Sequence, residues 1–258
     1  MTGDCREEDS RGQSHVIGVA LLLGLTVVVL GALTASVGVV VQDNAKTADV
    51  TRVAGDMDDA LQPVETTGTH AGQVAFTRGE LVVTERELRI LDENGDLVES
   101  ERGEIIDPEP VDALVYQTGD QRVTFQAGAV VRDTGHDAWM VSEPPVTASR
   151  DPEGVLVVGA AVLNSSSGSV ATTEPITTTL HTDVTHERTK LEEGTYRIAV
   201  ETDTPDAWEA YFESQGATVL DRTTFEGDRH ESVVVEFEGN REGYLVVHDM
   251  RLEVSVDG

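Results

Sequence analysis

The N-terminal part of the chain carries two hydrophobic patterns in succession. The first is an apolar run: Val16–Val41 contain no charged residue over 26 positions. A helix of that length would extend about 39 Å, whereas the hydrocarbon core of a bilayer is roughly 30 Å thick. We therefore expect a single transmembrane helix over 16–41, tilted or projecting beyond the bilayer.

The second pattern is amphipathic and covers 42–62. Its apolar residues follow one helical face, while aspartates mostly occupy the other face. Pro63 is expected to end the helix. We expect this half to place its apolar face on a sheet of the domain that follows. The positions on the apolar face are Val50, Val53, Ala54, Met57 and Leu61.

From about Ala71 the apolar period changes from helical to alternating, which predicts strands separated by turn sequences. Many short strands at regular spacing favour an antiparallel β-sandwich. We therefore expect an α+β fold, in which a long N-terminal transmembrane and amphipathic helix precedes a mainly antiparallel β-sandwich-like domain with one short helix. The candidate strands are 73–77, 80–84, 87–91, 97–101, 113–117, 122–126, 139–142, 155–163, 176–185, 195–201, 217–225, 232–238 and 244–256.

The short helix is expected over 204–216, where Thr204 and Pro205 form a start signal and Gly216 a stop. Its aromatic residues share one face at helical spacing, and such a stripe is typical of core packing rather than of a ligand site. They are Trp208, Tyr211 and Phe212, and the segment also has a weak resemblance to segments of haloarchaeal pilin-like ectodomains.

The charge narrows the choice of partners. The chain has 48 Asp and Glu against 18 Lys and Arg, so its formal net charge is −30. Proteins that bind nucleic acid through phosphates need clustered Lys and Arg, which this composition excludes. A folded, very acidic chain favours a high-salt environment, and an ordinary acidic surface domain is the alternative. Cys5 is the only cysteine, so no intrachain disulfide can form.

The junction before the apolar run carries a resemblance to a known family. A short polar leader, Met1–Gly12, ends in an Arg-Gly pair, and the next residues lead directly into the apolar helix. This order resembles the class III signal peptide of haloarchaeal type IV pilin-like and archaellin-like proteins. The resemblance implies that a membrane prepilin peptidase cuts between Gly12 and Gln13 and that the helix is kept. The remaining positions of the processing motif are Arg11, Ser14, Val16, Ile17 and Gly18.

One position departs from the bacterial pattern: Ile17 stands where many bacterial pilins carry Glu, although archaeal relatives often lack that Glu. The alternative to a pilin-type leader is a plain signal anchor. The apolar run also contains a stripe of small residues, which can let helices approach closely, as in a filament core, or can reflect the common use of Gly and Ala in membrane helices. The stripe consists of Ala20, Gly24, Gly31, Ala35 and Gly38.

Little in the sequence points to chemistry. Asn164-Ser165-Ser166 is a glycosylation sequon, so Asn164 is a possible glycan acceptor. His181 and His186 are five residues apart in a predicted strand and are expected on opposite faces, which argues against a shared metal. The acidic segment 92–96 is better explained as a hairpin turn than as a cation loop. We expect no catalytic residues, no metal and no cofactor.

The sequence thus predicts three parts: a prepilin-type leader over 1–12, a pilin-like helix over 13–62, and an extracellular β-rich domain over 63–258. The expected function is that of a type IV pilin-like surface subunit at the cell membrane, with a structural or adhesive role in a surface filament or as a minor pilin. The partners implied are prepilin peptidase, a pilus assembly ATPase, a platform protein, other pilin subunits and membrane lipid. The alternative is a permanently membrane-anchored extracellular β-domain that binds a ligand or an envelope component.

Overall fold

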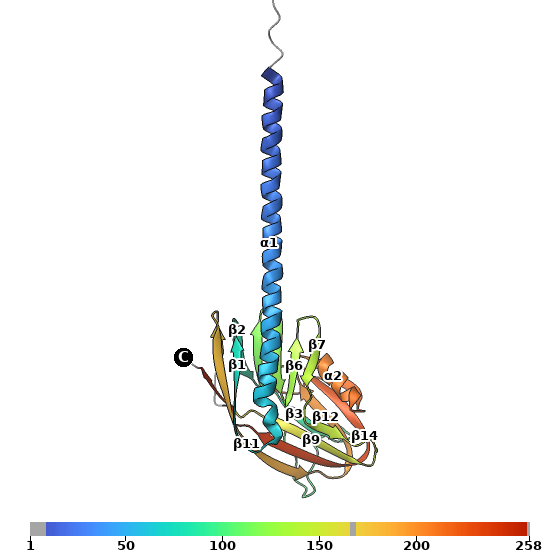
Figure 1. Ribbon diagram of the computed structural model, residues 1–258. Helices are drawn as coiled ribbons and strands as arrows, with labels where there is room; N and C mark the ends of the chain where they lie inside the picture. The colour runs from blue at the N-terminus through green and yellow to red at the C-terminus, as the bar shows by residue number, and fades with distance from the viewer. Residues whose placement is uncertain (1–8, 166–168, 257–258) are drawn as a thin grey trace, which may run out of the picture. The chain divides into compact units, whose positions relative to one another are not determined.

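The computed structural model describes residues 9–165 and 169–256 of the chain (Figure 1). The chain divides into two compact units, Met1–Ala48 and Asp49–Gly258. Helix α1 (Asp9–Leu61) supplies the first unit and also the start of the second, and a short 3-10 helix, η1 (Gln62–Glu65), follows it. The second unit is built almost entirely from strands, with α2 (Pro205–Ser214) as its other α-helix among the described residues.

The expected fold class, an α+β fold with a transmembrane helix and one short helix, is wrong. The structure is mostly β-sheet, and η1 is a helical element that the sequence did not predict. Within the described part of the chain, no helix is long and apolar enough to cross a membrane.

The strands form two sheets. One has the order β1-β11-β14-β12-β3, with β13 and β9 also paired to β14, β15 to β11 and β8 to β9. Its strands are β1 (Gly68–Phe76), β3 (Leu88–Leu91), β8 (Val146–Ala148), β9 (Val155–Val162), β11 (Ile176–Lys190), β12 (Gly194–Glu201), β13 (Thr218–Thr223), β14 (Ser232–Asp249) and β15 (Glu253–Val256). The pairing of β9 with β14 is parallel, so the sheet is mixed rather than purely antiparallel.

The other sheet has six strands in the order β10-β2-β4-β5-β6-β7, all joined in antiparallel fashion. They are β2 (Gly79–Thr84), β4 (Ala113–Thr118), β5 (Gln121–Gln126), β6 (Ala129–Asp133), β7 (Ala138–Ser142) and β10 (Val170–Thr172). In Figure 1, β2, β6 and β7 run across the direction of β9 and β14.

Two large clusters of buried apolar side chains hold the second unit together, and each draws on both sheets. One cluster combines β6 and β7 with β12, β14 and the aromatic face of α2. The other joins β2, β4 and β5 with β1, β11 and the end of α1. The apolar face predicted for the amphipathic half of α1 is buried there: Val50, Val53, Ala54, Met57 and Leu61 are each at most 3% exposed.

The contact between α1 and the sheet is close because of one glycine. A Cβ atom built on Gly72 in β1 would lie 2.3 Å from the Cβ of Ala60, so only glycine lets the helix pass at this distance. The last turns of α1 therefore belong to the β-rich unit, which begins at Asp49.

Candidate functional site

The residues of the expected processing site lie at the start of α1. The leader residues 1–8 are outside the described part of the chain, and the side chains of 9–18 are outside it as well. The structure therefore gives no geometry for the Gly12–Gln13 bond, and cleavage there stays a prediction. The affected positions are Arg11, Gly12, Gln13, Ser14, Val16, Ile17 and Gly18.

The small-residue stripe is described at two of its five positions. A Cβ atom built on Gly24 or on Gly31 would meet no atom within 4 Å. The surroundings of Ala20, Ala35 and Gly38 lie outside the described part of the chain. Large apolar side chains surround the two glycines and are solvent-exposed, as Leu21 at 69% illustrates. Both described glycines thus lie on an exposed part of the helix.

Two aspartates of α1, seven residues apart, accept hydrogen bonds from the end of β1 and from the residue just after it. The Asp56 carboxylate accepts a hydrogen bond from the backbone N–H of Ala75 at 3.2 Å. The Asp49 carboxylate accepts the backbone N–H of Thr77 at 3.0 Å and its hydroxyl at 2.9 Å. A separation of seven residues is two helical turns, so both carboxylates lie on one side of α1. Ala75 belongs to β1, the end strand in the order of its sheet, and Thr77 follows that strand.

Asp49 also reaches the second sheet. The Tyr116 hydroxyl in β4 lies 3.1 Å from the Asp49 carboxylate and 2.7 Å from the carbonyl oxygen of Arg78. Burial, with the nearby Asp49 charge as a further cause, raises the pKa of Tyr116 well above its usual range. Arg52 pairs with the same carboxylate from the next turn of the helix. A buried carboxylate with these partners holds the helix to both sheets.

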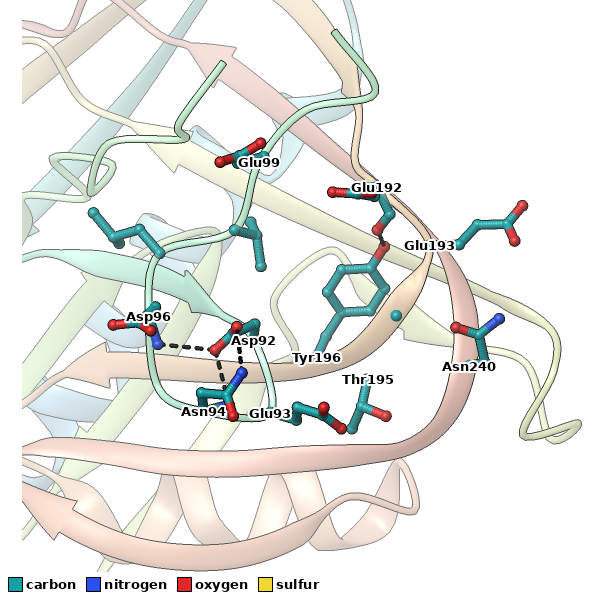
Figure 2. Close-up of a pocket in the computed structure, with 13 residues that line it drawn as sticks. Asp92, Glu93, Asn94, Asp96, Glu99, Glu192, Glu193, Thr195, Tyr196 and Asn240 are labelled. Atoms are coloured by element: carbon teal, nitrogen blue, oxygen red, sulfur yellow. Dashed lines mark hydrogen bonds between the residues drawn. The ribbon is translucent and has the colours of Figure 1, made fainter. Parts of the chain in front are cut away.

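One hollow on the β-rich unit is acidic. It has a volume of about 750 Å³ and lies between the segments 92–99 and 192–196 (Figure 2). Its carboxylate side chains are Asp92, Glu93, Asp96, Glu99, Glu192 and Glu193, and none of its lining residues is Lys, Arg or His. Because its wall contains carboxylates and no basic side chain, the hollow has a negative electrostatic potential that attracts cations.

The Asp92 carboxylate in this hollow forms hydrogen bonds within its own turn. Its carboxylate accepts the backbone N–H groups of Asn94 at 2.8 Å and Asp96 at 2.9 Å, and the Asn94 side-chain amide at 3.0 Å (Figure 2). The Asn94 amide is the main cause that lowers the pKa of Asp92. The hairpin turn predicted for this segment is present, with Leu91 and Leu97 bridged across it.

The described residues contain no group of three or more His, Cys, Asp and Glu side chains arranged to hold a metal ion. Tyr196, which lines the acidic hollow, donates its hydroxyl to the carbonyl oxygen of Glu192, and burial raises its pKa to about 12. A phenol with that pKa stays protonated at neutral pH. The charge of the hollow suits it to concentrating cations.

The structure contains a histidine pair that was not predicted from the sequence. His186 in β11 and His248 in β14 are directly opposite in the antiparallel ladder, and their Nδ1 atoms lie 2.8 Å apart. His181 is elsewhere, opposite Ala71 in β1 and Glu253 in β15. Only the register between two distant strands brings the pair together, so no local sequence signal could have found it.

Asn164 is exposed and has a positive φ of 42°. Its side-chain amide donates to the Asp249 carboxylate at 3.2 Å. Ser166, the hydroxyl residue of the sequon, lies outside the described residues. Glycosylation at Asn164 therefore stays a prediction.

The aromatic face of α2 packs in the core, as its spacing predicted. Trp208, Tyr211 and Phe212 are each at most 5% exposed and belong to the cluster that contains β12 and β14. The Tyr211 hydroxyl donates to the carbonyl oxygen of Val146 at 2.7 Å. These contacts bind α2 to the sheets and leave its aromatic rings no free face for a ligand.

Comparison with curated proteins and with solved structures finds no match to this chain. One protein family matches, and its description is "Family of unknown function (DUF7289)". The match covers residues 11–253, which is nearly the whole chain and includes α1, both sheets and α2. The protein therefore belongs to this family, DUF7289.

Proposed function

We propose that this protein is a structural, non-enzymatic surface subunit of the type IV pilin-like kind. In this proposal prepilin peptidase removes 1–12, and the chain that starts at Gln13 joins a surface filament or acts as a minor pilin. The assembly ATPase, the platform protein and neighbouring pilin subunits would be its partners. The role would be adhesive or architectural.

The observation that carries the proposal is how the β-rich unit holds the end of α1. Five apolar residues of that segment are part of a core cluster, and Asp49 contacts both sheets. A subunit that is pulled through its N-terminal helix needs such a connection, because any load on the residues before Asp49 enters the domain there. A flexible linker would not transmit the load.

Two sequence features support the same proposal. The polar leader, the Arg-Gly junction and the uncharged run occur in the order that the pilin-like family uses. The described part of that run exposes large apolar side chains, for example Leu25 at 62% and Val28 at 68%. Such a surface is stable only against apolar partners, which neighbouring subunits or lipid would supply.

N-terminal sequencing of the protein from its native cells tests the proposal. We expect a mature chain that starts at Gln13 and whose formation is lost in Gly12→Val, while the matched variant Gly18→Ala, beyond the cut, is still processed. Sheared surface material should contain the wild-type chain. A mature protein that keeps Met1 would contradict the proposal and favour the permanently anchored β-domain.

A further inference from the structure

The hairpin turn beside the acidic hollow contains a reactive dipeptide, Asn94-Gly95. Of the four asparagines in the chain, Asn94 is the one that precedes glycine. Asparagine is a thermolabile residue, because its side-chain amide is lost as ammonia when the next backbone nitrogen attacks it. Glycine promotes that attack, since it has no Cβ atom to shield its nitrogen. Asn94 and Gly95 are both solvent-exposed, so water has access to the pair.

The reaction open to this dipeptide is deamidation. Water or hydroxide removes the proton from the Gly95 backbone nitrogen, which then forms a bond to the side-chain carbonyl carbon of Asn94. The bond from that carbon to Nδ2 breaks, and Nδ2 leaves as ammonia after taking up a proton from water. A water molecule then opens the cyclic imide and leaves a carboxylate on a normal or an isoaspartyl backbone. In sum, an amide and a water become a carboxylate and an ammonium ion.

Two conditions must be met before the nitrogen can attack. The side-chain carbonyl carbon of Asn94 must come within about 3–3.5 Å of the Gly95 nitrogen, the usual distance for a near-attack arrangement. The Gly95 N–H must also give up its proton. The hydrogen bonds of the turn oppose both conditions.

The Asp92 carboxylate directs the Asn94 side chain away from the attacking nitrogen. One carboxylate oxygen accepts the Asn94 Nδ2 amide at 3.0 Å (Figure 2). The other oxygen accepts the backbone N–H groups of Asn94 at 2.8 Å and of Asp96 at 2.9 Å. The leaving group is thus bound to a residue two positions before Asn94, whereas the attacking nitrogen belongs to the residue after it. The side chain must give up a charge-assisted hydrogen bond before it can turn toward Gly95.

The backbone of the turn also engages the attacking nitrogen. The Gly95 N–H donates to the carbonyl oxygen of Asp92 at 3.1 Å. The turn is closed further out by the Asp92 N–H, which donates to the carbonyl oxygen of Asp96 at 2.8 Å, and by the bridge between Leu91 and Leu97. The proton that must be removed is therefore held in a hydrogen bond as long as the turn is formed.

We propose that Asn94 is a latent deamidation site and that Asp92 is the positioning residue that keeps it unreactive, by holding the side-chain amide away from Gly95. The amide stays intact while the hairpin turn is formed, and it reacts with water when the turn opens.

The protection extends over the whole neutral range of pH. The hydrogen bond from the Asn94 side chain is the main cause that lowers the pKa of Asp92 below its ordinary value of 3.8. Asp92 is therefore ionised, and only an acceptor, wherever the Gly95 nitrogen can lose its proton. A carboxylate formed at position 94 could not donate to Asp92 and would lie beside a like charge. Deamidation would thus break the turn that prevents it.

Peptide mapping by mass spectrometry tests the proposal on the full-length protein, kept in detergent and constant high salt at pH 8 and 37 °C. The loss of the Asn94 amide is followed with time. We expect folded wild type to lose it at least about tenfold more slowly than the same chain unfolded in guanidinium chloride. In folded Asp92→Ala the loss should be about tenfold faster than in folded wild type, the factor expected for one hydrogen bond to a charged group.

The matched control is Asp96→Ala, which removes an equal charge from the same exposed turn but keeps the backbone N–H that Asp92 accepts. This variant should react at the wild-type rate. Asn240 lines the same hollow, and its rate should not change in Asp92→Ala, which separates a local effect from loosening of the whole unit. Folded wild type that reacts as fast as the unfolded chain, or equal rates in Asp92→Ala and Asp96→Ala, would overturn the proposal. If Asp92→Ala does not fold, the comparison of folded and unfolded wild type decides.

Discussion

The contact between Asp49 and the two sheets makes a quantitative prediction. Asp49→Ala removes the acceptor of the Thr77 backbone N–H, the Thr77 hydroxyl and the Tyr116 hydroxyl. Tyr116 keeps the Arg78 carbonyl at 2.7 Å, whereas the exposed Thr77 exchanges its hydrogen bonds to a charged carboxylate for hydrogen bonds to water. A hydrogen bond to a charged group contributes about 1.5–3 kcal/mol to stability.

We therefore expect Asp49→Ala to lower the free energy of unfolding by about 2–3 kcal/mol, and Asp49→Asn to lower it by less, because the amide oxygen can still accept. Urea unfolding at constant high salt, followed by far-UV circular dichroism, measures the change. The matched control is Asp59→Ala on the exposed side of the same helix, which should change stability by less than about 0.5 kcal/mol. Equal values for Asp49→Ala and Asp59→Ala would refute the reasoning.

Two other predictions concern packing and charge. Gly72→Ala places a methyl group against Ala60, so it should lower the free energy of unfolding by about 1–3 kcal/mol. The control Gly55→Ala, with no atom within 4 Å of its added Cβ, should be neutral or slightly stabilising. Equal effects of the two variants in the same urea titration would contradict the close approach of helix and strand. The net charge of −30 should make the melting temperature rise as the KCl concentration is increased, because salt screens repulsion between carboxylates. Differential scanning calorimetry from low to molar KCl measures the melting temperature. A flat or falling melting temperature would count against adaptation to high salt.

The sequence predicted most strands of the β-rich unit and did not predict β6, β8 (Val146–Ala148) or β10 (Val170–Thr172). The predicted strands 113–117 and 122–126 correspond to β4 and β5. The strand β6 was missed because an Ala-Gly turn, not one of the common hairpin pairs, joins it to β5, with positive φ at both Ala127 and Gly128. The predicted strand 97–101 forms only isolated bridges.

The site was less predictable than the fold, because its contacts depend on register. The aspartates of the amphipathic half were expected mostly on the face opposite the apolar residues, yet Asp49 is 7% exposed and binds groups 28 and 67 residues further along the chain. Glu201 is a second buried carboxylate without a sequence signal: it accepts the backbone N–H groups of Glu87, Arg229 and His230, which three-dimensional structure alone brings together. Spacing along the chain predicts which face a residue occupies, and not which backbone groups meet it there.

The position of α1 along the open side of β1 has a consequence for fragments of the protein. Unpaired strand edges associate with other strands, and natural sheets cover or charge them to prevent it. Here the cover is the end of the helix, whose carboxylates occupy the N–H groups of Ala75 and Thr77. A domain cut after Leu61 would lose this cover, so edge-to-edge aggregation is its expected fate. The end of the helix thereby shields this edge of the sheet.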